Sequence, residues 1–183
     1  MKALLLRMVG IVPLLLFAAY VYAAVGENRA VESLWMCHVS NVFLGIGMLA
    51  QRPALVRMVF PWLVLGVPLW IIDDLATGHI CPVSTASHIG GFLVGLYAIW
   101  CMRVPSNPWL PALLLFMVFR ELCRWFTPAS FNVNLSHSVY TGWEDWFSNY
   151  PIYWVVTTLL AAACLWGIGR LMIVVFPPRL KDK

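Results

Sequence analysis

The chain has 183 residues, of which 62% are hydrophobic and only 11% charged, and its mean hydropathy is +0.82. A soluble domain carries about 25% charged residues, so this composition excludes an ordinary globular domain and indicates an integral membrane protein. The net charge of +4 comes with no basic–aromatic patch and no nucleotide-binding glycine motif, so we expect no nucleic-acid partner.

Six apolar segments meet or approach the roughly 20 residues that a spanning helix needs. We therefore expect an all-α, polytopic membrane protein, with residues 1–183 forming a single transmembrane helical domain. The expected spans cover about residues 8–25, 33–50, 56–72, 82–102, 108–123 and 151–175. Residues 124–150, rich in Trp, Asn and Ser, form one long outer loop.

The first segment has two interpretations. Lys2 and Arg7 precede an apolar core, and the later VYA resembles a signal-peptide cleavage site. The apolar run reaches Ala24 and is long enough to cross a bilayer, so we favour an uncleaved first span. A cleaved signal peptide stays open as the alternative and would leave the orientation of the other spans unchanged.

The basic residues indicate the orientation. Lys and Arg concentrate on the cytoplasmic side of membrane proteins. Alternating the spans collects most of them on one side, namely Lys2, Arg7, Arg52, Arg57, Arg103, Arg170, Arg179, Lys181 and Lys183. We therefore expect both termini in the cytoplasm, and the location to be a bacterial cytoplasmic (inner) membrane.

This orientation brings a thiol and an imidazole to the same depth. Cys37 lies about four residues inside the second span and His88 about six residues inside the fourth, both counted from the outer face. At ~1.5 Å per residue, both lie about 6–9 Å below the outer boundary. His38 is adjacent to Cys37 but ~100° around the helix, so it ranks second as a partner for the thiol.

Further polar side chains are expected in the same outer layer. They form a supporting polar shell around Cys37 and His88 and comprise Ser40, Asn41, Ser84, Asp73 and Asn134. Polar groups at membrane depth usually face a bundle interior or a cavity. We therefore expect a polar cavity that opens towards the outer leaflet.

A cysteine paired with a histidine is typical of nucleophilic catalysis, since the imidazole takes the proton and leaves a thiolate. Asn41, Ser40 or Ser84 would orient the imidazole or bind a developing oxyanion. The alternative is structural, because Ser, Asn and His also hydrogen-bond helices to one another.

The histidines and cysteines also allow three other kinds of site to be considered: a haem site, a disulfide and a metal site. His38 and His88 could be axial haem ligands from two spans, and Cys81 and Cys123 could form a disulfide at the outer helix ends. No CxxC or HExxH spacing is present, so the sequence does not indicate a metal site. We expect no cofactor.

Several short motifs follow one another in a characteristic order: WMCHVSNVFLGIGML, RPALVR, GVPLW, SHIGGFLVGLY, FNVN and YPIYW. Over roughly residues 33–170, this order resembles the YwaF-like integral membrane protein family, which includes the animal transmembrane protein 164. The resemblance implies a cysteine-dependent phospholipid acyltransferase that works through an acyl-thioester with a histidine partner. By motif position, Cys37 would be that cysteine and His88 that histidine.

The expected function is therefore that of an integral membrane enzyme, a thiol-dependent acyltransferase or lipid hydrolase that remodels phospholipids from an outer-leaflet cavity. Cys37 would carry the acyl group and His88 would act as general base and acid, with membrane lipids as partners. The alternative is a non-enzymatic membrane subunit that binds a lipid, haem or a partner helix in the same polar cavity.

Overall fold

The computed structural model describes residues 2–78, 81–102 and 107–177 and is all-helical, with no strand in these ranges. The expected all-α class is thereby confirmed. Six α-helices follow in chain order: α1 (Lys2–Gly26), α2 (Met36–Leu49), α3 (Pro53–Thr77), α4 (Pro82–Met102), α5 (Trp109–Phe126) and α6 (Tyr150–Val175). Three short 3₁₀ turns lie between them: η1 (Ala30–Leu34), η2 (Ala129–Phe131) and η3 (Val133–Leu135).

Four of these helices, α1, α3, α4 and α6, are long and apolar enough to cross a membrane. Helix α2 has 14 residues and is about 21 Å long, shorter than the ~30 Å hydrocarbon core. It is shorter than expected because residues 30–34 form η1 instead of a first α-helical turn. Helix α5 has 18 residues but carries Arg120, Glu121 and Arg124 in its last two turns.

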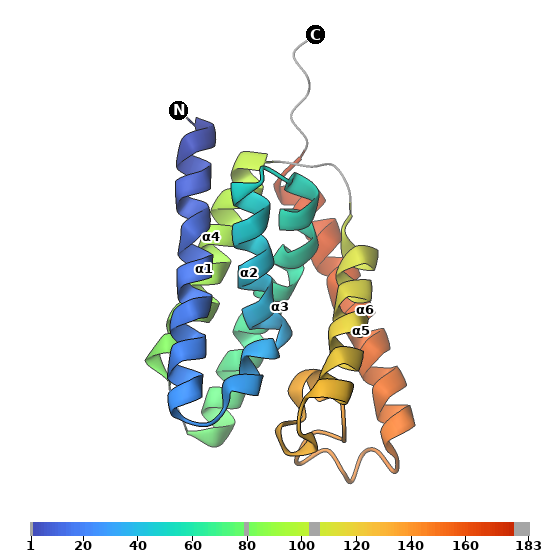
Figure 1. The fold of residues 1–183 in the computed structure, drawn as a ribbon. Coiled ribbons are helices and arrows are strands. Elements are labelled where there is room, and N and C mark those ends of the chain that lie inside the picture. Colours follow the sequence, from blue (N-terminus) through green and yellow to red (C-terminus); the bar gives the residue numbers. More distant parts are fainter. Residues whose placement is uncertain (1, 79–80, 103–106, 178–183) are drawn as a thin grey trace.

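Helices α1 to α4 form one bundle, in which α2 lies between α1 and α3, and α4 contacts both α1 and α3 (Figure 1). Helices α5 and α6 pair with each other and join the bundle through α3. The start of α1 and the end of α6 lie at one end of the molecule, and the long loop between α5 and α6 lies at the other. Four basic residues used to predict the orientation, Arg103, Arg179, Lys181 and Lys183, lie outside the described residues.

The long loop is fastened by one buried arginine. Arg120 of α5 is 1% exposed and donates hydrogen bonds to the backbone oxygens of Leu135 and Trp154 and to the hydroxyls of Thr157 and Thr158, at 3.0–3.3 Å. Its guanidinium also lies 5.1 Å from the ring centroid of Trp154. These bonds join α5, α6 and the loop at η3, so Arg120 is a structural cross-link.

The disulfide considered between Cys81 and Cys123 is not formed, because both cysteines are free thiols. Cys123 is instead 1% exposed, and its sulfur accepts a hydrogen bond from the side-chain amide of Asn134 at 3.3 Å. The buried sulfur therefore packs under the outer loop.

Candidate functional site

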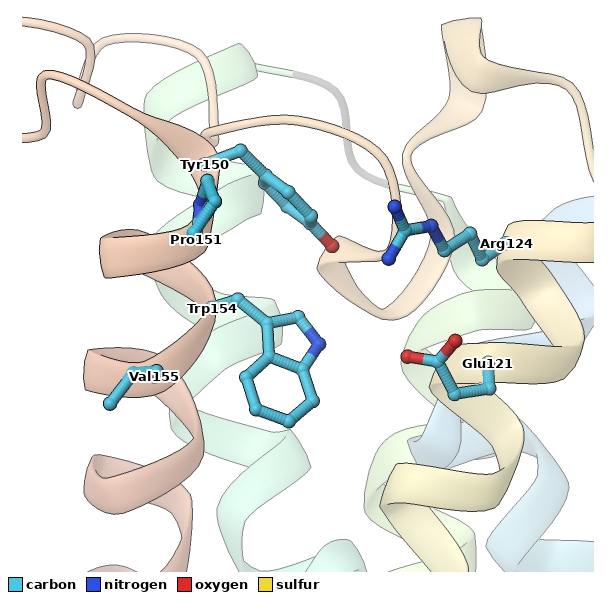
Figure 2. A pocket seen from close by; sticks show the side chains of 6 residues that line it. All are labelled: Glu121, Arg124, Tyr150, Pro151, Trp154 and Val155. Atoms are coloured by element: carbon cyan, nitrogen blue, oxygen red, sulfur yellow. The ribbon is translucent and has the colours of Figure 1, made fainter.

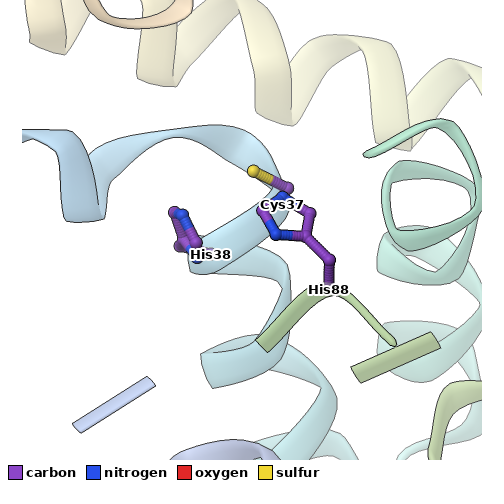
Figure 3. Close-up of side chains that lie close together, drawn as sticks. All are labelled: Cys37, His38 and His88. Atoms are coloured by element: carbon purple, nitrogen blue, oxygen red, sulfur yellow. The ribbon is translucent and has the colours of Figure 1, made fainter. Parts of the chain in front are cut away.

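Cys37 and His38 of α2 meet His88 of α4 in one small volume. One ligand-type atom of each, the sulfur and a ring nitrogen of each histidine, lies within 4.8 Å of the other two. Figure 3 shows the three side chains gathered between the helices. We refer to Cys37, His38 and His88 as the thiol–imidazole cluster. Its two histidines are buried, at 3% and 7% exposure, and Cys37 is half-buried.

Cys37 occupies the first turn of α2, and Asn134 fixes that turn from the outer loop. The Asn134 side-chain oxygen accepts a hydrogen bond from the Met36 N–H at 2.9 Å, and its amide donates to the Leu34 carbonyl at 2.8 Å. Asn134 therefore satisfies one of the free amides at the helix start.

The proton on His88 is positioned by its own helix. Nδ1 of His88 lies 2.9 Å from the Ser84 carbonyl oxygen and 3.4 Å from the Ser84 hydroxyl. Because a carbonyl oxygen only accepts, Nδ1 carries the proton and donates it, which leaves the lone pair on Nε2. The Trp70 ring of α3 stacks on the imidazole at a centroid distance of 5.4 Å. His88 is therefore oriented and in the tautomer that a general base requires.

His38 is held just as firmly, by α1 and α4. Its Nδ1 lies 3.1 Å from the Ser87 hydroxyl, and the Tyr20 ring stacks on the imidazole with centroids 3.6 Å apart. The His38 and His88 rings meet edge to face, with centroids 5.0 Å apart. The second-ranked histidine thus belongs to the same cluster as Cys37 and His88.

Asn41 ties α2 to α4 directly beneath the cluster. Its amide nitrogen lies within 3.3–3.4 Å of the Ser87 carbonyl and hydroxyl and of the Cys37 carbonyl. This contact depends on Gly91, where an added Cβ would collide with the Asn41 amide. Ser40, also expected in the supporting shell, is fully buried, and its hydroxyl has no partner among the described residues.

Helix α3 closes the cluster from a third side. A Cβ added at Gly66 would lie 2.9 Å from Cys37 Cβ and 3.6 Å from His88 Cδ2, so only glycine leaves both side chains in place. Further along α3, Asp74 interacts electrostatically with His88. The buried oxygen Oδ2 of Asp74 and the indole nitrogen of Trp70 have no hydrogen-bond partner within the described ranges.

Asp73, the carboxylate expected in the shell, instead fastens the outer loop. The Tyr140 hydroxyl donates to Asp73 Oδ1 at 2.7 Å. This hydrogen bond, together with partial burial, raises the pKa of Tyr140 to about 12. Asp73 is exposed, and it is the next residue, Asp74, that interacts with His88.

Four residues around the cluster are absent from the sequence-based set: Tyr20, Trp70, Asp74 and Ser87. Ser87 and Asp74 adjoin residues that the sequence does single out, and helical spacing places Trp70 and Asp74 on one face of α3. Tyr20 carries no such signal, because one aromatic residue in an apolar helix is typical of membrane packing.

A surface pocket of about 290 Å³ lies elsewhere, between α5 and α6. Figure 2 shows its six lining residues, Glu121, Arg124, Tyr150, Pro151, Trp154 and Val155. The Arg124 guanidinium lies 5.9 Å from the Tyr150 ring centroid, and the Tyr150 hydroxyl donates to the carbonyls of Leu135 and Ser136. None of these residues belongs to α2 or α4, so this pocket is separate from the thiol–imidazole cluster.

Comparisons of the chain with protein-family models, with curated proteins and with solved structures give no significant match.

Proposed function

We propose that the chain is a membrane enzyme that transfers or hydrolyses lipid acyl groups, with Cys37 as nucleophile and His88 as general base and acid. The observation that carries this proposal is the convergence of the Cys37 sulfur and a His88 ring nitrogen, within 4.8 Å, from two different helices. No hydrogen bond joins the two groups in the described structure, and catalytic contacts often tighten only when substrate binds.

The reaction is balanced in two half-steps. Nε2 of His88 takes the thiol proton as the Cys37 sulfur attacks the ester carbonyl of a lipid, and the imidazolium returns the proton to the departing alcohol. The thioester then passes its acyl group to an acceptor hydroxyl or to water, with the same proton transfers in the second half. The Asp74 carboxylate, which interacts with His88, stabilises the imidazolium.

The membrane setting supports a lipid substrate. We propose six spans with both termini in the cytoplasm, which puts the cluster in the outer half of the bilayer of a bacterial cytoplasmic membrane. In this arrangement α2 and α5, which are not among the four helices long and apolar enough to cross a membrane, pack against neighbouring helices that are. Lipid ester groups lie close to the membrane interface, about 6–9 Å above the depth expected for Cys37 and His88, so the ester would have to dip into the bundle to react. The motif order that resembles the YwaF-like family supports the same activity.

A non-enzymatic ligand-binding subunit is the second candidate. Its support is that the buried Ser40 hydroxyl and Asn41 Oδ1 have no hydrogen-bond partner within the described residues, whereas buried polar atoms are normally paired. Haem fits less well. Axial ligands approach iron from opposite faces of the porphyrin, whereas the His38 and His88 rings are in edge-to-face contact.

The test uses the full chain in proteoliposomes that contain phospholipid with labelled acyl chains. We expect the wild type to produce labelled free fatty acid or a labelled acceptor lipid, and Cys37→Ala to abolish this product. Cys164→Ala, which removes another half-buried thiol in α6, is the matched control and should retain activity. A Cys37→Ala variant as active as the wild type would overturn the proposal.

A further inference from the structure

We propose that the thiol–imidazole cluster also binds a single zinc ion, with the Cys37 sulfur and one nitrogen each of His38 and His88 as ligands. The sequence gives no metal-binding spacing, because two ligands come from adjacent residues of α2 and the third from α4. The set therefore becomes apparent only when the two helices are packed.

The distances fit one ion of this size. Zinc lies about 2.3 Å from a cysteine sulfur and about 2.1 Å from a histidine nitrogen, so its ligand atoms are about 3.4–3.6 Å apart at the tetrahedral angle. The three atoms here lie within 4.8 Å of one another, so shortening each separation by at most about 1.4 Å brings all three onto one ion. Thiolate and imidazole are also the ligand types that zinc prefers, and three protein ligands leave a fourth position open.

Both histidines are oriented in the way that metal ligands usually are. Such a histidine hydrogen-bonds through its other ring nitrogen, and this bond fixes the tautomer and the ring plane. Nδ1 of His38 is held by the Ser87 hydroxyl, and Nδ1 of His88 by the Ser84 carbonyl. No hydrogen bond occupies Nε2 of either ring within the described parts of the chain. Stacking by Tyr20 and Trp70 further restricts both imidazoles.

The surrounding charge favours a cation. Zinc bound to one thiolate and two neutral imidazoles keeps one positive charge, which is costly in a membrane unless it is compensated. Asp74 is close enough to interact electrostatically with His88, and its buried Oδ2 has no partner among the described residues. This carboxylate supplies the compensating charge.

Metal binding does not depend on the proposed acyl chemistry, although the two would compete. A zinc ion on the Cys37 sulfur withdraws the nucleophile, and a zinc ion on His88 withdraws the base. The metal-bound protein therefore cannot form the acyl-thioester.

The test uses the purified full chain in detergent, stripped of metal and titrated with Co²⁺ as the probe. We expect saturation at one ion per chain, with a near-ultraviolet absorption band from sulfur-to-cobalt charge transfer, and displacement of Co²⁺ by added Zn²⁺. Cys37→Ser should abolish the band, and His38→Ala and His88→Ala should each weaken binding by roughly tenfold or more. Cys101→Ala and Cys164→Ala, which remove other half-buried thiols, should not change it.

A second measurement needs no variant. Zn²⁺ should slow alkylation of wild-type Cys37 by a maleimide, as followed by peptide mass spectrometry, and leave alkylation of Cys164 unchanged. Absence of a 1:1 cobalt band, its persistence in Cys37→Ser, or unprotected alkylation would overturn the metal proposal. An acyl-thioester without metal binding would refute only the metal site. Metal binding by a chain whose metal-free form produces no acyl-thioester would refute only the proposed enzyme.

Discussion

Two buried polar clusters lie in different halves of this bundle, and they differ in how fully their hydrogen bonds are satisfied. At Arg120, between α5, α6 and the loop, all three guanidinium nitrogens donate to described backbone or threonine oxygens. Around the thiol–imidazole cluster, polar atoms of Ser40, Asn41, Trp70 and Asp74 have no partner in the described ranges. Buried polar groups in native proteins are normally paired, so the first cluster is complete as a structural element, whereas the second leaves several buried polar atoms unsatisfied.

The largest expected effect is a difference in the free energy of unfolding between variants of two equally buried arginines, Arg120 and Arg57. Arg120→Met removes the five hydrogen bonds by which Arg120 joins α5 to α6 and the outer loop and should lower the free energy of unfolding by about 3 kcal/mol. Arg57→Met is the matched control. Arg57 is also 1% exposed, but its guanidinium has no partner among the described residues, so its replacement should be neutral or stabilising.

Thermal unfolding of both arginine variants in the same detergent measures this difference. Equal destabilisation of the two would remove the contrast between a satisfied and an unsatisfied buried cation.

The next effect concerns the close approach of α3 to Cys37. Gly66→Ala places a methyl group 2.9 Å from Cys37 Cβ and should cost about 2 kcal/mol through overpacking. By displacing Cys37 from His88 it should also lower acyl transfer by roughly tenfold to a hundredfold. Gly167→Ala in α6, where an added Cβ meets nothing within 4 Å, should leave activity unchanged. Full activity in Gly66→Ala would show that acyl transfer does not need the close approach of α3 to Cys37.

A smaller effect is expected from the outer-loop cap on α2. Asn134→Gly keeps the left-handed backbone at φ 53° but removes the side-chain bonds to Met36 and Leu34, at a cost of about 1 kcal/mol. Asn149→Ala removes the equivalent cap of α6, where Asn149 Oδ1 accepts from the Ile152 N–H at 3.0 Å.

Both cap variants should lose similar stability, but only Asn134→Gly should change the rate at which Cys37 is alkylated. An altered rate in Asn149→Ala as well would mean that Cys37 reports general loosening of the bundle.

The smallest effect is expected at Ser40. Its buried hydroxyl has no partner among the described residues, so Ser40→Ala should change the free energy of unfolding by less than about 0.5 kcal/mol. If instead it lowers lipid-dependent activity while the unfolding temperature is unchanged, the hydroxyl contacts substrate. A loss of more than about 1 kcal/mol would show that the Ser40 hydroxyl is hydrogen-bonded in the ligand-free protein and has a structural role like that of Arg120.

The helices were predictable because lipid burial requires apolar runs, and the fourth segment has the expected bounds, residues 82–102. The start of α2 was not predictable, since hydropathy does not distinguish the 3₁₀ turn at residues 30–34 from a helical turn. The proximity of Cys37 and His88 was predicted from their expected depth alone, because residues equally far from one membrane face lie in one layer.

Other parts of the site depend on packing that a sequence does not display. Cys37 packs against Gly66 of α3, while its neighbour His38 stacks on Tyr20 of α1, and both still reach His88. A helical wheel separates Cys37 and His38 by ~100° but does not reveal that both lie close to the same third side chain, His88. Asn134 caps α2 across 98 residues of chain, a contact that no local pattern encodes.

The proposed mechanism requires that Cys37 becomes acylated. Intact mass spectrometry of the purified chain, after incubation with phospholipid vesicles, measures this modification. We expect a mass increase of one acyl group, localised to Cys37 by peptide mapping, removed by neutral hydroxylamine and absent in Cys37→Ala. His88→Gln should slow its appearance. An unmodified Cys37 in a protein that still turns over lipid would rule out Cys37 as the nucleophile.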